Sequence, residues 1–263
     1  MSTLRRWALP IGVIAVLLLV YLVNPWSQPE GDLRSAVTVL FWIAFIVLLV
    51  ALFHDRREAG ATEVEIEAPA FARYLLANSR AGLFWLPIRL FLGFEWLEAG
   101  WHKLSPTDAE GVTHYFAGTG WLDGGASLAG YWTRAVTVPE GARSAPISFE
   151  WYKDFINYML ANNAETWFAW LIVFGELAVG IGLIFGILTG IAAFFGAFMN
   201  MSFLLAGSAS SNPVMFALAV GLILAWRVAG YYGADRWLLP MLGTPWQPGA
   251  LFRRKAETAP ASG

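Results

Sequence analysis

Cysteine is absent from the chain, and charged residues are scarce. The lack of cysteine excludes disulfides, thiolate nucleophiles and iron–sulfur clusters held by this chain. Charged residues make up 14% of the 263 residues and hydrophobic residues 57%, whereas a soluble domain usually carries about 25% charge. The net charge of −2 gives no sign of a nucleic-acid partner. This composition predicts an integral membrane protein whose first partner is the lipid bilayer.

Six hydrophobic segments are candidates for spanning helices, each of which needs roughly 20 mostly apolar residues. They cover about 7–23, 36–53, 81–101, 165–187, 190–206 and 213–229. The fold class that follows is an all-α, polytopic membrane helix bundle. The first segment has the basic start of a signal peptide, but no small-residue cleavage site follows Leu22 and Val23. An uncleaved anchor is therefore the favoured reading.

Basic residues gather on one side of the predicted membrane. With the N-terminus inside, eleven of the 17 basic residues are cytoplasmic, five lie in outer loops, and Arg89 lies within a span. The positive-inside rule then predicts a multi-pass protein of the cell membrane with both termini in the cytoplasm. The outer basic residues are Arg34, Lys103, Arg134, Arg143 and Lys153.

The chain is predicted to divide into four parts. These are an N-terminal transmembrane hairpin (1–53), a cytoplasmic linker (54–80), a four-helix membrane domain (81–242) and a cytoplasmic tail (243–263). The outer loop of the membrane domain, 103–164, is too long for a turn. Apolar residues recur at helical spacing over 149–160, which predicts an amphipathic helix lying at the outer interface.

Two charges fall in the middle of predicted spans, where ionisable groups are costly and face the bundle interior. Arg89 lies near the middle of the third span and Glu176 near the middle of the fourth. Because these spans run antiparallel, we predict an Arg89–Glu176 ion pair. The pair serves either to fix the register of the helices or as part of a proton or substrate site.

A second polar group lies toward the outer end of the third span. Spacings of three and four residues place Glu95, Glu98 and His102 on one helical face, next to Lys103. This face is either a proton-relaying site or a wet helix end. Asn200 lies within the fifth span and Asn212 at the outer turn after it, which makes a shared outer polar cavity a further hypothesis.

No motif for a metal, haem, flavin or nucleotide is found in the sequence. The three histidines lack zinc-type spacing. His54 and His102 are predicted at opposite membrane faces, so they cannot ligate one haem iron. Any redox chemistry would depend on a bound quinone or on a partner subunit.

Four passages, in order over about 81–242, resemble the DoxX/DoxD family of bacterial membrane proteins. The passages are Arg89-Leu90-Phe91-Leu92-Gly93 with Glu98 to Leu104, Gly175-Glu176-Leu177, Phe198-Met199-Asn200 with Ala209 to Pro213, and Ala229 to Arg236. The resemblance implies a four-helix membrane core. Some members are subunits of thiosulfate:quinone oxidoreductase, which passes electrons from thiosulfate to quinone. Residues 1–80 lie outside the resemblance.

The resemblance implies a quinone-linked oxidoreductase subunit with a partner redox subunit. In this interpretation Trp96 and Trp101 form the walls of a quinone site, and His102 or Arg89 donates a hydrogen bond to the quinone carbonyl. Glu95, Glu98 or Glu176 exchanges protons, and Arg89, Lys103 or Arg134 attracts an anionic substrate such as thiosulfate. Asn200 and Asn212 complete the site. A quinone site needs apolar walls and a few polar groups.

A second reading makes the protein a non-enzymatic membrane scaffold or assembly subunit. A second copy of the chain is then a candidate partner. A small transporter is less favoured, because the sequence shows neither an inverted repeat nor a broken helix pair.

Overall fold

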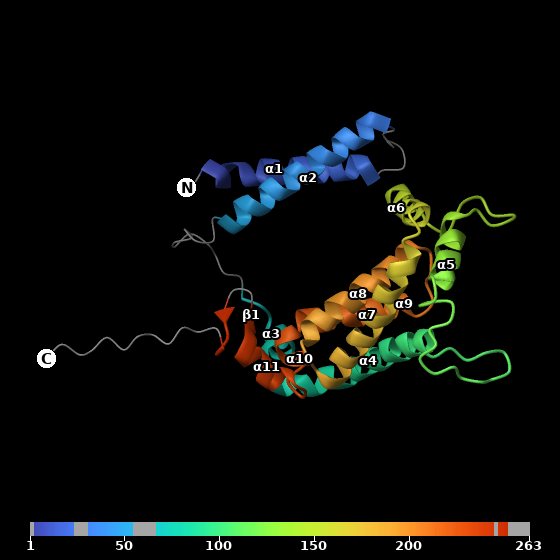
Figure 1. The fold of residues 1–263 in the computed structure, drawn as a ribbon. Helices are drawn as coiled ribbons and strands as arrows, with labels where there is room; N and C mark the ends of the chain where they lie inside the picture. Colours follow the sequence, from blue (N-terminus) through green and yellow to red (C-terminus); the bar gives the residue numbers. More distant parts are fainter. Residues whose placement is uncertain (1–2, 24–30, 55–66, 245–246, 252–263) are drawn as a thin grey trace. The chain divides into compact units, whose positions relative to one another are not determined.

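The computed structural model describes residues 3–23, 31–54, 67–244 and 247–251, which form helices and a hairpin of two two-residue strands, joined by turns and loops (Figure 1). The chain divides into two compact units, Met1–Glu67 and Ala68–Gly263, which are described separately. Part of the segment predicted as a linker belongs to the second unit and contains helix α3 (Ala70–Ala77) and the 3₁₀ helix η2 (Ser79–Ala81).

The first unit is a helical hairpin of α1 (Thr3–Val23) and α2 (Gly31–His54). The two helices pack where small residues meet larger side chains, as Gly12 does against Leu48. Most of their large apolar side chains point outward, and only 6% of the apolar stretch of α2 is buried. Apolar surface of this extent is typical of helices that face lipid rather than water.

The second unit is built on four long helices: α4 (Gly82–Leu104), α7 (Glu165–Phe185), α8 (Thr189–Leu205) and α9 (Asn212–Leu224). The short helices α5 (Ala126–Val136) and α6 (Glu150–Ala161) lie at one end, and α10 (Trp226–Ala229) and α11 (Asp235–Leu242) at the other (Figure 1). The strands β1 (Gly243–Thr244) and β2 (Gln247–Pro248) follow α11. The predicted sixth span is thus divided at Ala225 into α9 and α10.

Glycines bring α4 and α7 into close antiparallel contact. A Cβ atom on Gly93 would lie 2.8 Å from the Ile184 side chain, and one on Gly180 would lie 2.6 Å from the Leu97 nitrogen. A Cβ atom on Gly100 would lie 2.8 Å from Leu177. Small residues allow such backbone approach within membrane bundles. These contacts fix the register of the two helices and hence the groups that lie at the same depth.

Two apolar clusters stabilise this unit. One lies between the long helices and includes Leu92, Trp96, Leu183 and Leu222. The other joins α5, α6 and the first turns of α7 through Leu128, Trp132, Ile156, Met159 and Ala169. Helix α6 forms in the segment for which the sequence predicts an amphipathic helix, and its Ile156 and Met159 are buried.

Two helices in the described part of the chain are long and apolar enough to cross a membrane: Asp32–Val50 within α2, and α7. Three further apolar stretches, Pro10–Leu22, α8 and α9, are shorter. Helix α4 has the length, but its charged residues, Arg89, Glu95 and Glu98 among them, lower its hydropathy.

A polar junction closes the bundle at the turn between α7 and α8. Asp235 accepts hydrogen bonds from the Leu188 and Thr189 nitrogens, at 2.6 and 2.8 Å, and so caps the start of α8. The buried Arg89 donates from Nη2 to the Tyr232 carbonyl at 2.9 Å. Gly186 has φ +66°, and a Cβ atom there would collide with Arg89 Nη1.

We expect Gly186→Ala to lower the free energy of unfolding by more than about 2 kcal/mol, because an L-residue is strained at this φ and its methyl group would displace the guanidinium. The measurement is reversible unfolding in mixed detergent micelles. The matched control is Gly130→Ala in α5, where a Cβ atom meets nothing within 4 Å and the change should be stabilising by up to about 1 kcal/mol. Equal stabilities of the two variants would contradict this account.

Candidate functional site

A buried ion pair joins α4 and α7 near the end of the bundle where α5 lies. Lys103 Nζ lies 2.8 and 2.6 Å from the two carboxylate oxygens of Glu176. The Glu176 side chain is 1% exposed and that of Lys103 17%. Lys103 also donates to the Ala99 carbonyl at 3.3 Å, one turn back along its own helix. The lysine chain therefore reaches inward to compensate a carboxylate that lipid and protein both exclude from water.

The predicted Arg89–Glu176 pair is wrong. Glu176 pairs with Lys103, and Arg89 lies in the junction with Tyr232 and Asp235. The glycine contacts put Glu176 at the level of Trp101, which is twelve residues, or about 18 Å, along α4 from Arg89. Charges from α4 and α7 do meet inside the bundle, but the partner of Glu176 is Lys103 and not the predicted Arg89.

The predicted face of Glu95, Glu98 and His102 is exposed. His102 Nε2 lies 3.5 Å from a Glu98 oxygen, and the two side chains are 64% and 49% exposed. Glu95 is half-buried and lies one turn further back. Because both side chains are exposed to solvent, this contact contributes little to the stability of the fold. These residues do not meet Glu176 or Arg89 in one site.

The remaining predicted residues separate in the same way. Trp96 and Asn200 are 2% and 0% exposed within the bundle. Trp101 is exposed and packs edge-on against Phe116, in the loop between α4 and α5. Asn212 donates to the Ser208 carbonyl at 3.0 Å, so it closes the turn before α9. The ten predicted residues therefore do not form a single quinone site.

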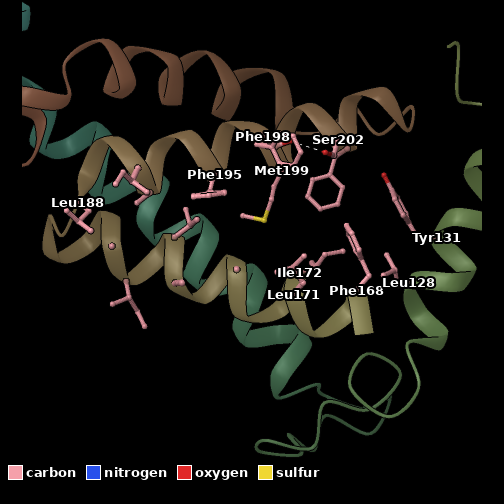
Figure 2. A pocket seen from close by; sticks show the side chains of 18 of the residues that line it. Leu128, Tyr131, Phe168, Leu171, Ile172, Leu188, Phe195, Phe198, Met199 and Ser202 are labelled. Carbon is pink, nitrogen blue, oxygen red and sulfur yellow. Dashed lines mark hydrogen bonds between the residues drawn. The ribbon is translucent and has the colours of Figure 1, made fainter. Parts of the chain in front are cut away.

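A large apolar groove, which the sequence reading missed, runs along α7 and α8 (Figure 2). Its volume is about 690 Å³, and Leu188 lies at one end while Leu128 and Tyr131 lie at the other. Small residues of α7 at helical spacing, Gly175, Ala178 and Gly182, leave the space that the groove occupies. That small-residue pattern is the signal in the sequence that could have located it.

Neutral hydroxyl groups mark one end of the groove. The buried Tyr131 hydroxyl has no hydrogen bond of good geometry within the described residues, although Ser208 lies close enough to influence it. Burial raises the pKa of Tyr131 to about 12, so the phenol remains a neutral donor. Tyr152 donates to the Ser202 carbonyl at 3.0 Å beside it. The groove thus combines long apolar walls with the phenol hydroxyl of Tyr131 at one end (Figure 2).

We expect Lys103→Met to lower the free energy of unfolding by about 3–5 kcal/mol, because it leaves the Glu176 carboxylate buried without its partner. The double variant Lys103→Met/Glu176→Leu should recover most of that loss, since it removes both charges. Unfolding in mixed micelles measures both. Lys153→Met, on the partly exposed face of α6, is the control. If Lys103→Met lowers the free energy of unfolding no more than the control does, the ion pair does not stabilise the fold as proposed.

Comparison with known proteins gives one result. Residues 84–208, which run from α4 through α8, match the DoxX family. No significant match was found among curated proteins or among solved structures. The matched region contains the Lys103–Glu176 pair, helices α5 and α6, and every residue that lines the groove. The chain therefore contains a DoxX domain, at residues 84–208.

Proposed function

We propose that this protein binds a lipid-soluble quinone and serves as the membrane subunit of a quinone-linked redox complex. The observation that carries the proposal is the groove along α7 and α8. Its volume of about 690 Å³ lies within the usual range of ligand pockets, roughly 300–1,000 Å³. The quinone ring is assigned to the Tyr131 end and the isoprenoid tail to the stretch toward Leu188.

The lining favours a neutral amphiphile. None of the described residues that line the groove is charged, so a phospholipid head group would find no cation to pair with. The Tyr131 hydroxyl offers one hydrogen bond to a carbonyl oxygen. A quinone combines a small uncharged head that accepts such a bond with a flexible apolar tail. The structure thus supports a different set of contacts from those predicted around Trp96 and His102.

The groove is accessible from the side. Its rim contains Leu171, Ile191, Phe195 and Phe198, which are all exposed. If these side chains face lipid, a tail can enter directly from the bilayer. A molecule that partitions into the membrane then reaches the site without crossing water. This arrangement suits a ligand that is itself dissolved in the bilayer.

The electron donor in this proposal is a partner subunit. The chain has no cysteine that could hold an iron–sulfur cluster. Lys103, which the sequence suggested as an anion site, has its charge compensated by Glu176. We therefore assign recognition of a soluble donor to the partner. Thiosulfate is the first donor to test, because the resemblance includes thiosulfate:quinone oxidoreductase subunits.

The proposal also includes six spans in the cell membrane with both termini in the cytoplasm. The six are α1, α2, α4, α7, α8 and α9 extended by α10, which contain 21, 24, 23, 21, 17 and 13 plus 4 residues. Basic residues concentrate on the predicted inner side. In this orientation the Tyr131 end of the groove is outer.

We expect the purified protein in nanodiscs to bind a benzoquinone carrying one isoprene unit, and Ala178→Phe to abolish that binding. Ala178 lines the groove and is itself exposed, so the larger ring fills the space without disturbing the core. Tyr131→Phe should weaken binding about fivefold, which corresponds to one hydrogen bond of about 1 kcal/mol. Equilibrium titration of quinone against intrinsic tryptophan fluorescence provides the measurement.

The matched control for the groove variant is Ala217→Phe, which changes another exposed alanine, in α9 and outside the groove. It should bind quinone as the unmodified protein does. Absence of binding to the unmodified protein, or equal binding to the Ala178→Phe variant, would overturn the quinone site. The scaffold reading would then be preferred, and loss of complex assembly rather than of turnover would be its signature.

The absence of cysteine allows a background-free test of the orientation. We expect Ser144→Cys, in the exposed outer loop, to react with a membrane-impermeant maleimide in intact cells. Ser79→Cys, exposed in η2, should react only after lysis. Labelling of Ser79→Cys in intact cells would reverse the proposed orientation.

A further inference from the structure

Asn200 places two polar atoms, its side-chain amide oxygen and nitrogen, in the interior of the bundle without hydrogen-bond partners among the described residues. Its side chain is 0% exposed, and neither Oδ1 nor Nδ2 has a hydrogen-bond partner within the described residues. Buried amide groups are normally satisfied by protein or by ordered water. Asn200 does not line the apolar groove. It therefore requires a partner that the groove ligand does not supply.

The helix register places Asn200 at the depth of the Lys103–Glu176 pair. A Cβ atom on Gly196 would lie 2.9 Å from Trp96 Nε1 and 3.2 Å from Val179, so α8, α4 and α7 meet at that level. One turn further toward the outer helices, these three elements present Asn200, Ala99 and Glu176. Lys103 Nζ lies at this same level, because it donates to the Ala99 carbonyl.

Trp96 adds a second unused donor beside this layer. Its Nε1 has no partner among the described residues, although the side chain is only 2% exposed. Trp85 in the same helix shows the ordinary arrangement, since its Nε1 donates to the Leu75 carbonyl at 2.8 Å. By the helix register, two donors and one acceptor thus lie near the depth of the Glu176 carboxylate, which accepts hydrogen bonds only from Lys103 in the described structure.

Lys103 connects this layer with the outer surface. Its side chain is 17% exposed, and its ammonium group lies 5.1 Å from the centre of the Trp121 ring in the outer loop. The lysine chain is therefore a narrow polar link between the surface and Glu176. Among the described residues, Lys103 is the one charged group that acts on the Glu176 carboxylate.

We propose that Asn200, Trp96 and Glu176 form a second binding site, distinct from the groove, which holds ordered water and communicates with the outer surface along Lys103. Water is the ligand because it both donates and accepts, and because a buried water typically makes about three hydrogen bonds to otherwise unsatisfied groups. The site gives the buried carboxylate access to water from the outer side. It does not depend on the occupant of the groove.

The first test is radiolytic hydroxyl labelling of the full-length protein in nanodiscs. Bound water generates radicals in place, so we expect Trp96 to be oxidised several-fold faster than Trp85, which is 8% exposed but already hydrogen-bonded. Asn200→Leu should reduce the Trp96 rate to that of Trp85, because leucine cannot hold the water. Its melting temperature shows whether the bundle is intact. Equal rates at the two tryptophans in the unmodified protein would overturn the proposal.

The second test uses introduced cysteines in the same cysteine-free chain. Asn200→Cys should react with a small methanethiosulfonate ammonium reagent. Ala193→Cys, on the same helix and also 0% exposed but among apolar side chains, should remain unreactive. The melting temperature of each variant, compared with that of the unmodified protein, shows whether the variant is folded. The proposal requires both tests to succeed, and equal protection of the two cysteines would exclude a connection with the outside.

Discussion

The glycine-mediated contact between α4 and α7 is the constraint on which the rest of this unit depends. Gly93, Gly100 and Gly180 leave no room for a Cβ atom, so the two backbones can approach only in one register. The contact staggers the helices. The first turns of α7 extend beyond α4 and pack against α5 and α6, and the first turns of α4 extend toward α10. This stagger decides which charges meet.

The stagger also explains what the sequence could and could not reveal. The hydropathy pattern predicts all the long helices, and most of the predicted ends lie within a few residues of the observed ones. A run of apolar residues directly indicates a segment that is buried in protein or exposed to lipid. The predicted Arg89–Glu176 pair is wrong because residues in the middle of two antiparallel helices need not lie at the same depth. Depth depends on the packing of glycines against particular side chains, and a single sequence does not encode that contact as a pattern.

Candidate residues could be predicted as polar groups in apolar surroundings, but their distribution among sites could not. The sequence singles out Lys103 as a candidate binding residue, but its contact with Glu176 depends on a side chain that bends back past Ala99. Tyr131 was not singled out, because its isolated hydroxyl becomes informative only when α5 packs against α7. The groove depends on what small residues leave empty, and hydropathy does not report empty space.

These features bear on whether the bundle serves only as a scaffold. Scaffolding requires close packing, and α4 and α7 achieve it. It does not require an amide with two unused polar atoms at Asn200, since an unsatisfied buried polar group costs about 1–3 kcal/mol. It does not require an apolar groove of about 690 Å³ beside that packing either. Val179 belongs to both the groove wall and the Trp96 layer, so one helix face separates an apolar site from a polar one. An apolar groove and a buried polar layer, held by one rigid helix pair, are therefore more consistent with the proposed ligand binding than with a scaffold alone.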